Sequence, residues 1–193
     1  MKTIIEHYVF DGSTVNNYIC ALDISKAFDR VDHFALLKLL IDRKLPRAFI
    51  GVMMDWLSKS IVCVKWAGVF SFRFCIKAGV RQGGVLYPVL FAVFMDTLIE
   101  RLRRLIGLGC RIFDQFYDCL LYADDILLLS HSVNAMRRML MICDQFAAEF
   151  DMKFNSGKSV VLRIGNRYNA QCVPLTLNGE VLKFISELKY LGV

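Results

Sequence analysis

The sequence lacks the histidine content and the cysteine spacing that are typical of zinc-binding and disulfide-rich proteins. It contains only three histidines, and no two of its seven cysteines form a Cys-x-x-Cys pair. A zinc site or a disulfide framework is therefore not expected. The cysteines are scattered among apolar neighbours, so we expect them to be reduced core residues of an intracellular protein.

Long hydrophobic runs are also lacking. Outside the stretch around residue 124, the longest apolar run spans residues 83–95 and contains Pro88. A membrane-spanning helix needs about 20 apolar residues. Residues 1–15 lack the basic start and apolar centre of a signal peptide. The sequence therefore predicts no membrane partner.

Acidic residues are outnumbered by basic ones, 18 against 24, which leaves a net charge of +6. This balance favours a polyanionic partner, and nucleic acid before a membrane surface. The basic residues are dispersed along the chain, so charge alone supports nucleic acid only weakly. With 193 residues, 56% of them hydrophobic, the chain is one domain with a sizeable core or a piece of a longer protein.

Two adjacent carboxylates interrupt one apolar stretch. Residues 119–130 read CLLYADDILLLS, with Asp124 and Asp125 at the centre. Apolar residues on both sides predict two short strands, joined by a hairpin bend that carries both aspartates. Asp tolerates turn geometry, which would explain the pair without any function. Alternatively, the pair is part of a site for a divalent cation such as Mg²⁺, which takes oxygen ligands.

Such a cation site needs a third carboxylate, and Asp23 is the candidate. It lies near the end of the apolar run 18–24, which predicts a buried strand. If this strand is a neighbour of the hairpin, the three carboxylates converge. Two Mg²⁺ ions about 4 Å apart would then stabilise both oxygens of an in-line phosphoryl transfer. A lone Asp at a strand end, however, is usually a cap.

The rest of the chain alternates between helical and strand patterns. Asp32 can cap a helix, Pro46 can start the next one, and Asn178-Gly179 is a signal for a type I′ turn. The expected helices span residues 33–43, 46–58, 87–105 and 132–150. The further expected strands span residues 61–76 (a hairpin), 159–164, 175–177, 181–185 and 188–193. This order predicts the α+β class, with an antiparallel sheet and helices packed on one face.

Five blocks of the sequence resemble, in family order, the reverse transcriptase domain of non-LTR (LINE-type) retrotransposons. ALDISKAFDRVDH (residues 21–33) resembles the first palm motif, and GVRQGGVLYPVLF (79–91) resembles the glycine–glutamine motif. YADD (122–125) resembles the polymerase signature, NSGKS (155–159) the lysine motif, and LKYLGV (188–193) the start of the primer grip. The resemblance implies a polymerase palm that adds dNTPs to a DNA primer on an RNA template.

The resemblance also implies roles for individual residues. Asp23 and Asp124 would be the principal ligands of two Mg²⁺ ions, which Mn²⁺ could replace, with Asp125 and the Ile24 carbonyl completing the site. The resemblance implies that Phe28 is a steric gate against the ribose 2′-hydroxyl and that Arg81, Gln82 and Gly83 form a loop behind the nucleotide and template base. It also implies that Lys158 is a general acid near the triphosphate and that Tyr190 and Gly192 belong to the primer grip.

Each of these further residues also has an ordinary interpretation. Phe28 can be a core aromatic on a helix, Lys158 an exposed lysine in a turn, and residues 81–83 a plain loop. The chain also departs from the family pattern, because Tyr87 stands where the family usually has Ser. This departure concerns local packing and not the metal site.

The resemblance makes residues 1–193 a partial palm. Only 22 residues precede Asp23, so we expect most of the fingers and the thumb to be absent and the isolated fragment to be inactive. The alternative is a decayed retroelement fragment that acts at most as a basic RNA-binding module. A group II intron maturase is a further alternative among the enzymes. The implied compartments are the cytoplasm and nucleus, and the oligomeric state is left open.

Overall fold

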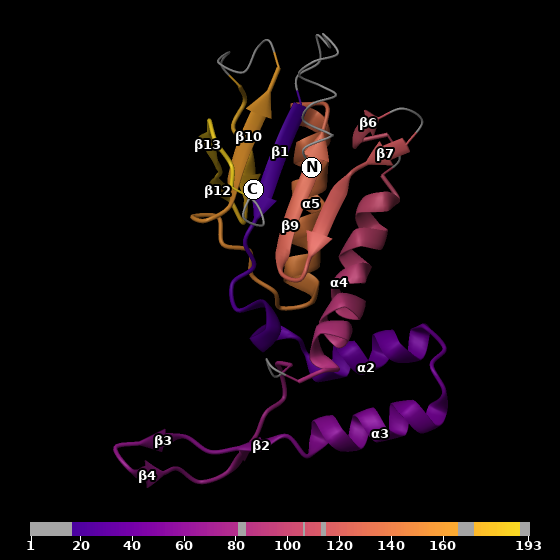
Figure 1. The fold of residues 1–193 in the computed structure, drawn as a ribbon, viewed down its shortest axis with the longest axis vertical. Coiled ribbons are helices and arrows are strands. Elements are labelled where there is room, and N and C mark those ends of the chain that lie inside the picture. Colours follow the sequence, from indigo (N-terminus) through magenta and orange to yellow (C-terminus); the bar gives the residue numbers. More distant parts are fainter. Residues whose placement is uncertain (1–16, 81–83, 106, 113–114, 166–171, 190–193) are drawn as a thin grey trace. The chain divides into compact units, whose positions relative to one another are not determined.

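The computed structural model describes residues 17–80, 84–105, 107–112, 115–165 and 172–189 (Figure 1). The chain divides into two compact units, one formed by residues 1–25 and 97–193 and the other by residues 26–96. Among the described residues, no helix has both the length and the apolar composition that crossing a membrane requires.

The first unit is built on a five-stranded sheet. Its strand order is β13-β10-β1-β9-β8. The strands are β1 (Asn17–Leu22), β8 (Cys119–Tyr122), β9 (Asp125–Ser130), β10 (Val160–Ile164) and β13 (Lys183–Ile185). All neighbours are antiparallel except β10 and β13, which are parallel. The α+β class is confirmed, and the predicted antiparallel sheet is in fact mixed.

Strand β1 is the centre of this sheet. It pairs with β10 along one edge and with β9 along the other, with Ile19 opposite both Leu162 and Leu129. One face of the sheet packs into a cluster that includes Ile19, Leu127, Leu129 and Cys110. The other face is covered by α5 (Figure 1). Burial on both faces explains why β1 and β9 are continuously apolar instead of alternating.

Helix α5 (Val133–Glu149) matches the prediction closely. The Ser132 hydroxyl caps it by accepting a hydrogen bond from the Ala135 N–H, at 3.2 Å. The residues predicted to pack are buried, except that Phe150 is half-buried just after the helix. Arg101 makes a bidentate ion pair with Glu149 and lies over the Phe146 ring. The 3.6-residue period of the apolar positions therefore decided which face of this helix is buried.

Two small hairpins complete the first unit. The predicted type I′ turn is confirmed, because Asn178 and Gly179 have φ values of 52° and 77°. The predicted strand 181–185 is divided into β12 and β13. Strands β6 and β7 were not predicted. The strands of the two hairpins are β6 (Cys110–Ile112), β7 (Gln115–Tyr117), β11 (Thr176–Leu177) and β12 (Glu180–Val181).

The second unit begins with a short 3₁₀ turn and continues with two helices and a two-stranded ribbon. Asp32 caps α2, as predicted, by accepting a hydrogen bond from the Ala35 N–H at 2.7 Å. Pro46 lies directly before α3. The elements are η1 (Ala27–Arg30), α2 (His33–Asp42), α3 (Arg47–Ser58), β2 (Ile61–Val62), β3 (Lys65–Trp66), β4 (Val69–Phe70) and β5 (Phe74–Cys75). Helix α4 (Tyr87–Arg103) begins in this unit and extends into the other.

The seven cysteines are free thiols, of which three are buried, two are exposed and two, Cys119 and Cys172, are half-buried. Cys20, Cys110 and Cys143 are buried, as predicted, whereas Cys63 and Cys75 are exposed on the ribbon. The prediction of core cysteines was therefore wrong for the last two. Burial raises the pKa of the Cys20 and Cys110 thiols to about 12, because the charged thiolate is poorly solvated there.

The difference in burial between Cys63 and Cys75 on one side and Cys20 and Cys110 on the other predicts selective alkylation. The raised pKa lowers the thiolate fraction of Cys20 and Cys110 roughly a thousandfold at neutral pH. Iodoacetamide should therefore modify Cys63 and Cys75 first and reach the buried thiols only after denaturant is added. Peptide mass mapping of a time course checks this order. Early labelling of Cys20 or Cys110 would contradict the burial described here.

Candidate functional site

The three aspartates predicted to bind metal all lie at one end of the strands β1, β8 and β9. Asp23 directly follows β1, Asp124 lies in the turn between β8 and β9, and Asp125 is the first residue of β9. Leu22 pairs with Ile126, so the next position along the antiparallel pair brings Asp23 opposite Asp125. The structure therefore brings Asp23 and Asp125 together across neighbouring strands, with Asp124 beside them in the chain.

The turn that carries Asp124 is tight. Tyr122 pairs with Asp125, so only Ala123 and Asp124 connect the two strands. Ala123 has a φ of 52°, which is uncommon for a residue with a side chain and costs on the order of 1–3 kcal/mol. The pairing on both sides of the turn maintains this conformation. Asp124 and Asp125 are consequently exposed at the edge of the sheet.

The carboxylates influence one another electrostatically. The pKa of Asp125 is raised, first by partial burial and then by the negative charges of Asp124 and Asp23. A cation would relieve this repulsion, and carboxylate oxygens are the ligands that Mg²⁺ takes. Within the part of the chain that the structure describes, however, no three such side chains are gathered closely enough to hold a metal ion. The donor chemistry therefore fits Mg²⁺, while the ligands do not form a ready-made cage.

The backbone of Asp23 is held on both sides by the segment 153–159. The Asp23 N–H donates to the Ser159 hydroxyl at 3.1 Å, and the Asn155 N–H donates to the Asp23 carbonyl at 2.8 Å. The Ser159 hydroxyl donates in turn to the Asn155 carbonyl at 2.8 Å. Ser159 is fully buried. These bonds form a clamp that fixes the position from which the Asp23 side chain projects.

The two clamp residues, Asn155 and Ser159, were not predicted from the sequence. In the segment NSGKS only Lys158 was a candidate residue. The available signal was a pair of short polar side chains flanking a turn, since such side chains hydrogen-bond nearby backbone groups. Nothing local, however, indicates that the partner is Asp23, which is 136 positions away in the sequence.

A cleft of about 260 Å³ lies beside this clamp. It brings together residues from four predicted motifs, including Asp23, Asp125, Lys158 and Lys189. Its remaining lining is Ala21, Leu22, Ile126, Val160 and Leu188. Lys158 is exposed, and its N–H donates to the Asn155 carbonyl. The cleft thus combines two carboxylates with two basic side chains, an arrangement suited to a bound cation and a phosphate group.

Ile24 does not line this cleft. It is buried and forms an isolated antiparallel bridge with Phe154. The Ser25 N–H donates to the Lys153 carbonyl at 2.8 Å, so the chain stays attached to the same segment after Asp23. The candidate primer-grip residues Tyr190 and Gly192 lie outside the described residues.

The remaining candidates belong to the second unit. Phe28 lies in η1, half-buried, and its ring stacks on Phe91 with centroids 4.4 Å apart. The Phe28 carbonyl accepts a hydrogen bond from the Val80 N–H at 2.7 Å. The segment before the glycine–glutamine loop is thus tied to the turn that carries Phe28. Arg81, Gln82 and Gly83 lie outside the described residues.

Gly79, at the start of this loop, must be glycine. Its φ is +99°, and a Cβ there would lie 3.1 Å from the Asp29 carbonyl oxygen. Tyr87, where the chain departs from the family pattern, is well accommodated. It is buried and stacks on Trp56 with centroids 5.1 Å apart. The departure therefore does not disturb local packing.

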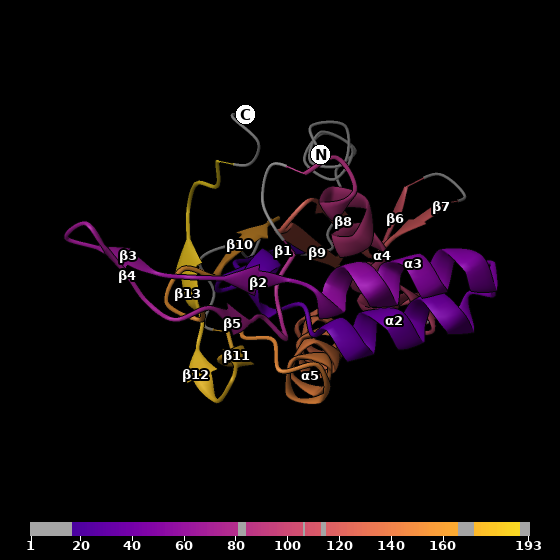
Figure 2. The same cartoon turned by 90° about the horizontal axis from the view of Figure 1, so that it is seen from below.

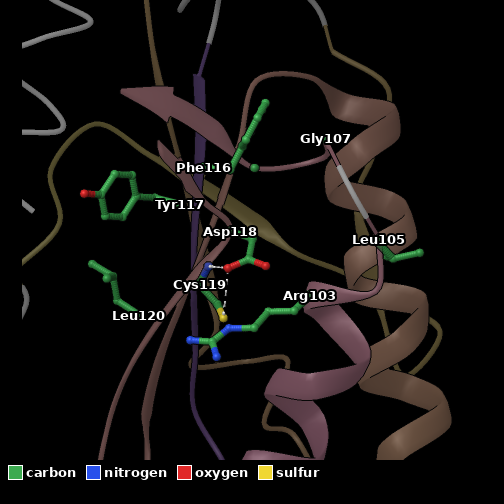
Figure 3. Close-up of a pocket in the computed structure, with 9 residues that line it drawn as sticks. Arg103, Leu105, Gly107, Phe116, Tyr117, Asp118, Cys119 and Leu120 are labelled. Atoms are coloured by element: carbon green, nitrogen blue, oxygen red, sulfur yellow. Dashed lines mark hydrogen bonds between the residues drawn. The ribbon is translucent and has the colours of Figure 1, made fainter. Parts of the chain in front are cut away.

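A larger pocket, of about 520 Å³, lies between the end of α4 and strands β7 and β8 (Figure 3). It contains none of the three aspartates. Its Cys119 donates to Asp118, and burial together with the Asp118 charge raises the pKa of the thiol to about 12. A thiol with this pKa is a poor nucleophile at neutral pH. The motif residues Asp23, Asp125 and Lys158 line the smaller cleft instead.

Comparison with known proteins agrees with this geometry. The family model "Reverse transcriptase (RNA-dependent DNA polymerase)" matches residues 2–193. The RNA-directed DNA polymerase from the mobile element jockey of Drosophila funebris is 31% identical over 90% of this chain and 19% of its own length. The Pol polyprotein of the type-2 retrotransposable element R2DM of Drosophila melanogaster is 27% identical over 91% of this chain and 17% of its own length.

Solved structures extend the likeness to the fold. Telomerase from Candida tropicalis, in complex with a TWJ fragment of telomeric RNA, matches with a TM-score of 0.66 and 13% identity, over 89% of this chain and 29% of that one. The fold is therefore that of a palm-type polymerase. The chain spans about a fifth of the length of the two curated relatives described above. Because the family model covers nearly the whole sequence, the chain belongs to the reverse transcriptase (RNA-dependent DNA polymerase) family.

Proposed function

We propose that this chain is the palm of an RNA-directed DNA polymerase that acts in retrotransposition. The reaction is the addition of dNTPs to the 3′-hydroxyl of a DNA primer on an RNA template. One observation carries the proposal: Asp23, Asp125 and Lys158 line one cleft, and the charge of Asp124 acts on Asp125. The family membership supports the same reaction.

In this proposal Asp23, Asp124 and Asp125, with the Ile24 carbonyl, hold two Mg²⁺ ions, and Mn²⁺ can replace them. When bound, these ions polarise the primer hydroxyl and neutralise charge on the triphosphate. The clamp formed by Asn155 and Ser159 fixes the position of Asp23. Positioning matters because an enzyme does little covalent chemistry in phosphoryl transfer.

The basic side chains and the loops complete the proposal. Lys158 donates a proton to the leaving pyrophosphate, or attracts its negative charge. Phe28 excludes the ribose 2′-hydroxyl. The nucleotide and the template base contact Arg81, Gln82 and Gly83, and the primer terminus contacts Tyr190 and Gly192.

A second candidate function is RNA binding without chemistry. Two observations favour it. Among the described residues, no cluster of three or more His, Cys, Asp or Glu side chains is arranged to hold a metal ion, and the net charge of the chain is +6. The two functions differ in their need for metal. A binding module retains its affinity for RNA in EDTA, whereas a polymerase needs the divalent ion to bind nucleotide productively.

Primer extension tests the polymerase directly. We expect extension on an RNA template when this chain replaces the corresponding segment of the jockey polymerase. Asp124→Asn in that chimera should lower the rate about a thousandfold, because it removes several kcal/mol of charge stabilisation. Asp42→Asn, which changes an exposed carboxylate at the end of α2, is the matched control. Equal rates in the two variants would refute the proposed metal site.

The clamp makes a separate prediction. Ser159→Ala leaves the Asp23 N–H without its buried acceptor and should cost about 1–3 kcal/mol of stability. Ser132→Ala is the matched control, because it also removes one serine hydroxyl. Loss of this helix cap of α5 should cost about 1 kcal/mol of stability. Only Ser159→Ala should raise the Mg²⁺ concentration needed for half-maximal extension. If both variants shift the Mg²⁺ titration alike, Ser159 has only a structural role.

Sugar selection tests Phe28. In the same chimera, Phe28→Val should increase the incorporation of ribonucleotides relative to deoxyribonucleotides, because a smaller side chain leaves room for the 2′-hydroxyl. Phe91→Leu removes the stacking partner of Phe28 and controls for lost packing. The ratio of the two products on sequencing gels measures selectivity. An unchanged ratio in Phe28→Val would identify Phe28 as an ordinary packing residue.

A further inference from the structure

The polymerase proposal assigns no role to the ribbon formed by residues 60–76. Strand β2 pairs with β5 and β3 pairs with β4, and the Ser71 N–H donates to the Val64 carbonyl between the two pairs. Ala67 and Gly68, with φ values of 47° and 84°, form its turn. Figures 1 and 2 show the ribbon extending from the end of α3, away from both helices of its unit.

The aromatic side chains of the ribbon are exposed to an unusual degree. Every residue from 63 to 75 is exposed. Trp66 is 82% exposed and Phe72 is 97% exposed. Phe70 and Phe74 are also largely in solvent. Large apolar patches on a protein surface mark interaction sites, so this ribbon is expected to have a partner.

The charge of the ribbon indicates the chemistry of that partner. Residues 56–95 contain no Asp or Glu, and the ribbon and its flanks contain four basic residues, namely Lys59, Lys65, Arg73 and Lys77. Lys65 lies over the Phe70 ring, with its ammonium 5.4 Å from the centroid. Lys59 is paired with Asp55. The ribbon itself therefore presents aromatic rings and positive charge together, and its own segment of the sequence contains no acidic residue.

The rings are distributed over both faces of the ribbon. Lys65 is opposite Phe70, and Trp66 is opposite Val69. Since opposite residues share a face and successive residues alternate, Phe70 and Trp66 point to opposite faces. A flexible strand of nucleic acid can stack its bases on either face. A folded protein would have to enclose the ribbon and supply acidic residues on both sides.

We propose that the ribbon binds single-stranded nucleic acid, with bases stacked on Trp66 and Phe72 and phosphates attracted to Lys65 and Arg73. Aromatic platforms combined with basic side chains are the common means of binding single strands without sequence preference. This goes beyond the proposed polymerisation, because binding at the ribbon needs neither metal nor nucleotide.

Tryptophan fluorescence of the whole chain provides the test. The chain contains two tryptophans, so Trp56→Phe leaves Trp66 as the sole reporter. Single-stranded oligo(U) and oligo(dT) of about 12 nucleotides should both quench Trp66, because stacking tolerates any base and a binding site of this kind covers about 4–16 nucleotides. The quenching should persist in EDTA and weaken as salt increases. A duplex of the same length should bind about tenfold more weakly or worse.

A matched pair of variants assigns the binding to the ribbon. Trp66→Ala combined with Phe72→Ala should weaken binding of the labelled oligonucleotide at least about tenfold. Phe34→Ala removes an aromatic ring that is 78% exposed on α2, off the ribbon, and should leave the affinity unchanged. Circular dichroism checks that both variants retain the fold, which is expected because the replaced rings are in solvent.

Several outcomes would overturn the proposal. Three of them are an absence of quenching, equal affinities of the two variants for the oligonucleotide, and equal affinity for single strand and duplex. A fourth is quenching that depends on protein concentration when no oligonucleotide is present, because it would identify a second copy of the chain as the partner. The polymerase proposal is tested separately. If the unsubstituted ribbon does not bind oligonucleotide while primer extension is normal, only the ribbon proposal is overturned. If the ribbon binds but no extension occurs, only the polymerase proposal is overturned.

Discussion

The double pairing of β1 is the constraint on which the candidate site depends. This strand is hydrogen-bonded to β10 along one edge and to β9 along the other, and both of its faces are buried. A one-residue slip would move its apolar side chains to the wrong faces, so the register is strongly specified. The register places the end of β1 beside the start of β9, and with it Asp23 beside Asp125. The clamp of Asn155 and Ser159 then fixes the residue that follows the strand.

The same arrangement creates an electrostatic problem that a cation can solve. Partial burial raises the pKa of Asp125, and the charges of Asp124 and Asp23 at the same sheet edge raise it further, because like charges oppose each other's ionisation. The nearby Lys158 and Lys189 line the same cleft and provide positive charge for an anionic ligand. Without a bound cation and an anionic ligand, holding these like charges close together is electrostatically unfavourable. For this reason we propose that the chemistry takes place in this cleft and not in the larger pocket around Cys119.

The two units differ in how they use apolar residues. In the first unit, the sheet and α5 bury their apolar side chains almost completely, as in Leu127 and Phe146. In the second unit, the ribbon leaves Trp66 and Phe72 in water. A two-stranded hairpin is marginally stable by itself and has no core of its own to fill. Its aromatic side chains are therefore better explained by what they contact than by what they stabilise.

Local patterns in the sequence were sufficient for many elements. The apolar period of α5, the caps Asp32 and Ser132, and the turn Asn178-Gly179 each depend on neighbours within about four positions, and the structure agrees with all of them. The hairpin predicted over residues 61–76, where apolar and polar residues alternate from Phe70 to Lys77, is present. The alternation could not reveal that the hairpin would remain exposed, because burial depends on what packs against it.

The sequence by itself determined the type of most elements, though not of β6 and β7, as well as the family motifs and the candidate residues Asp23, Asp124, Asp125 and Lys158. Only the tertiary structure decided that β10 and β13 run parallel, that Phe28 stacks on Phe91, and that Ser159 accepts the Asp23 N–H. The reason is physical. Helix periods, caps and turns arise from interactions between near neighbours, whereas strand order and buried hydrogen bonds join residues that are distant in sequence. Any of several distant partners satisfies the same local pattern, and the packing of the whole unit selects one.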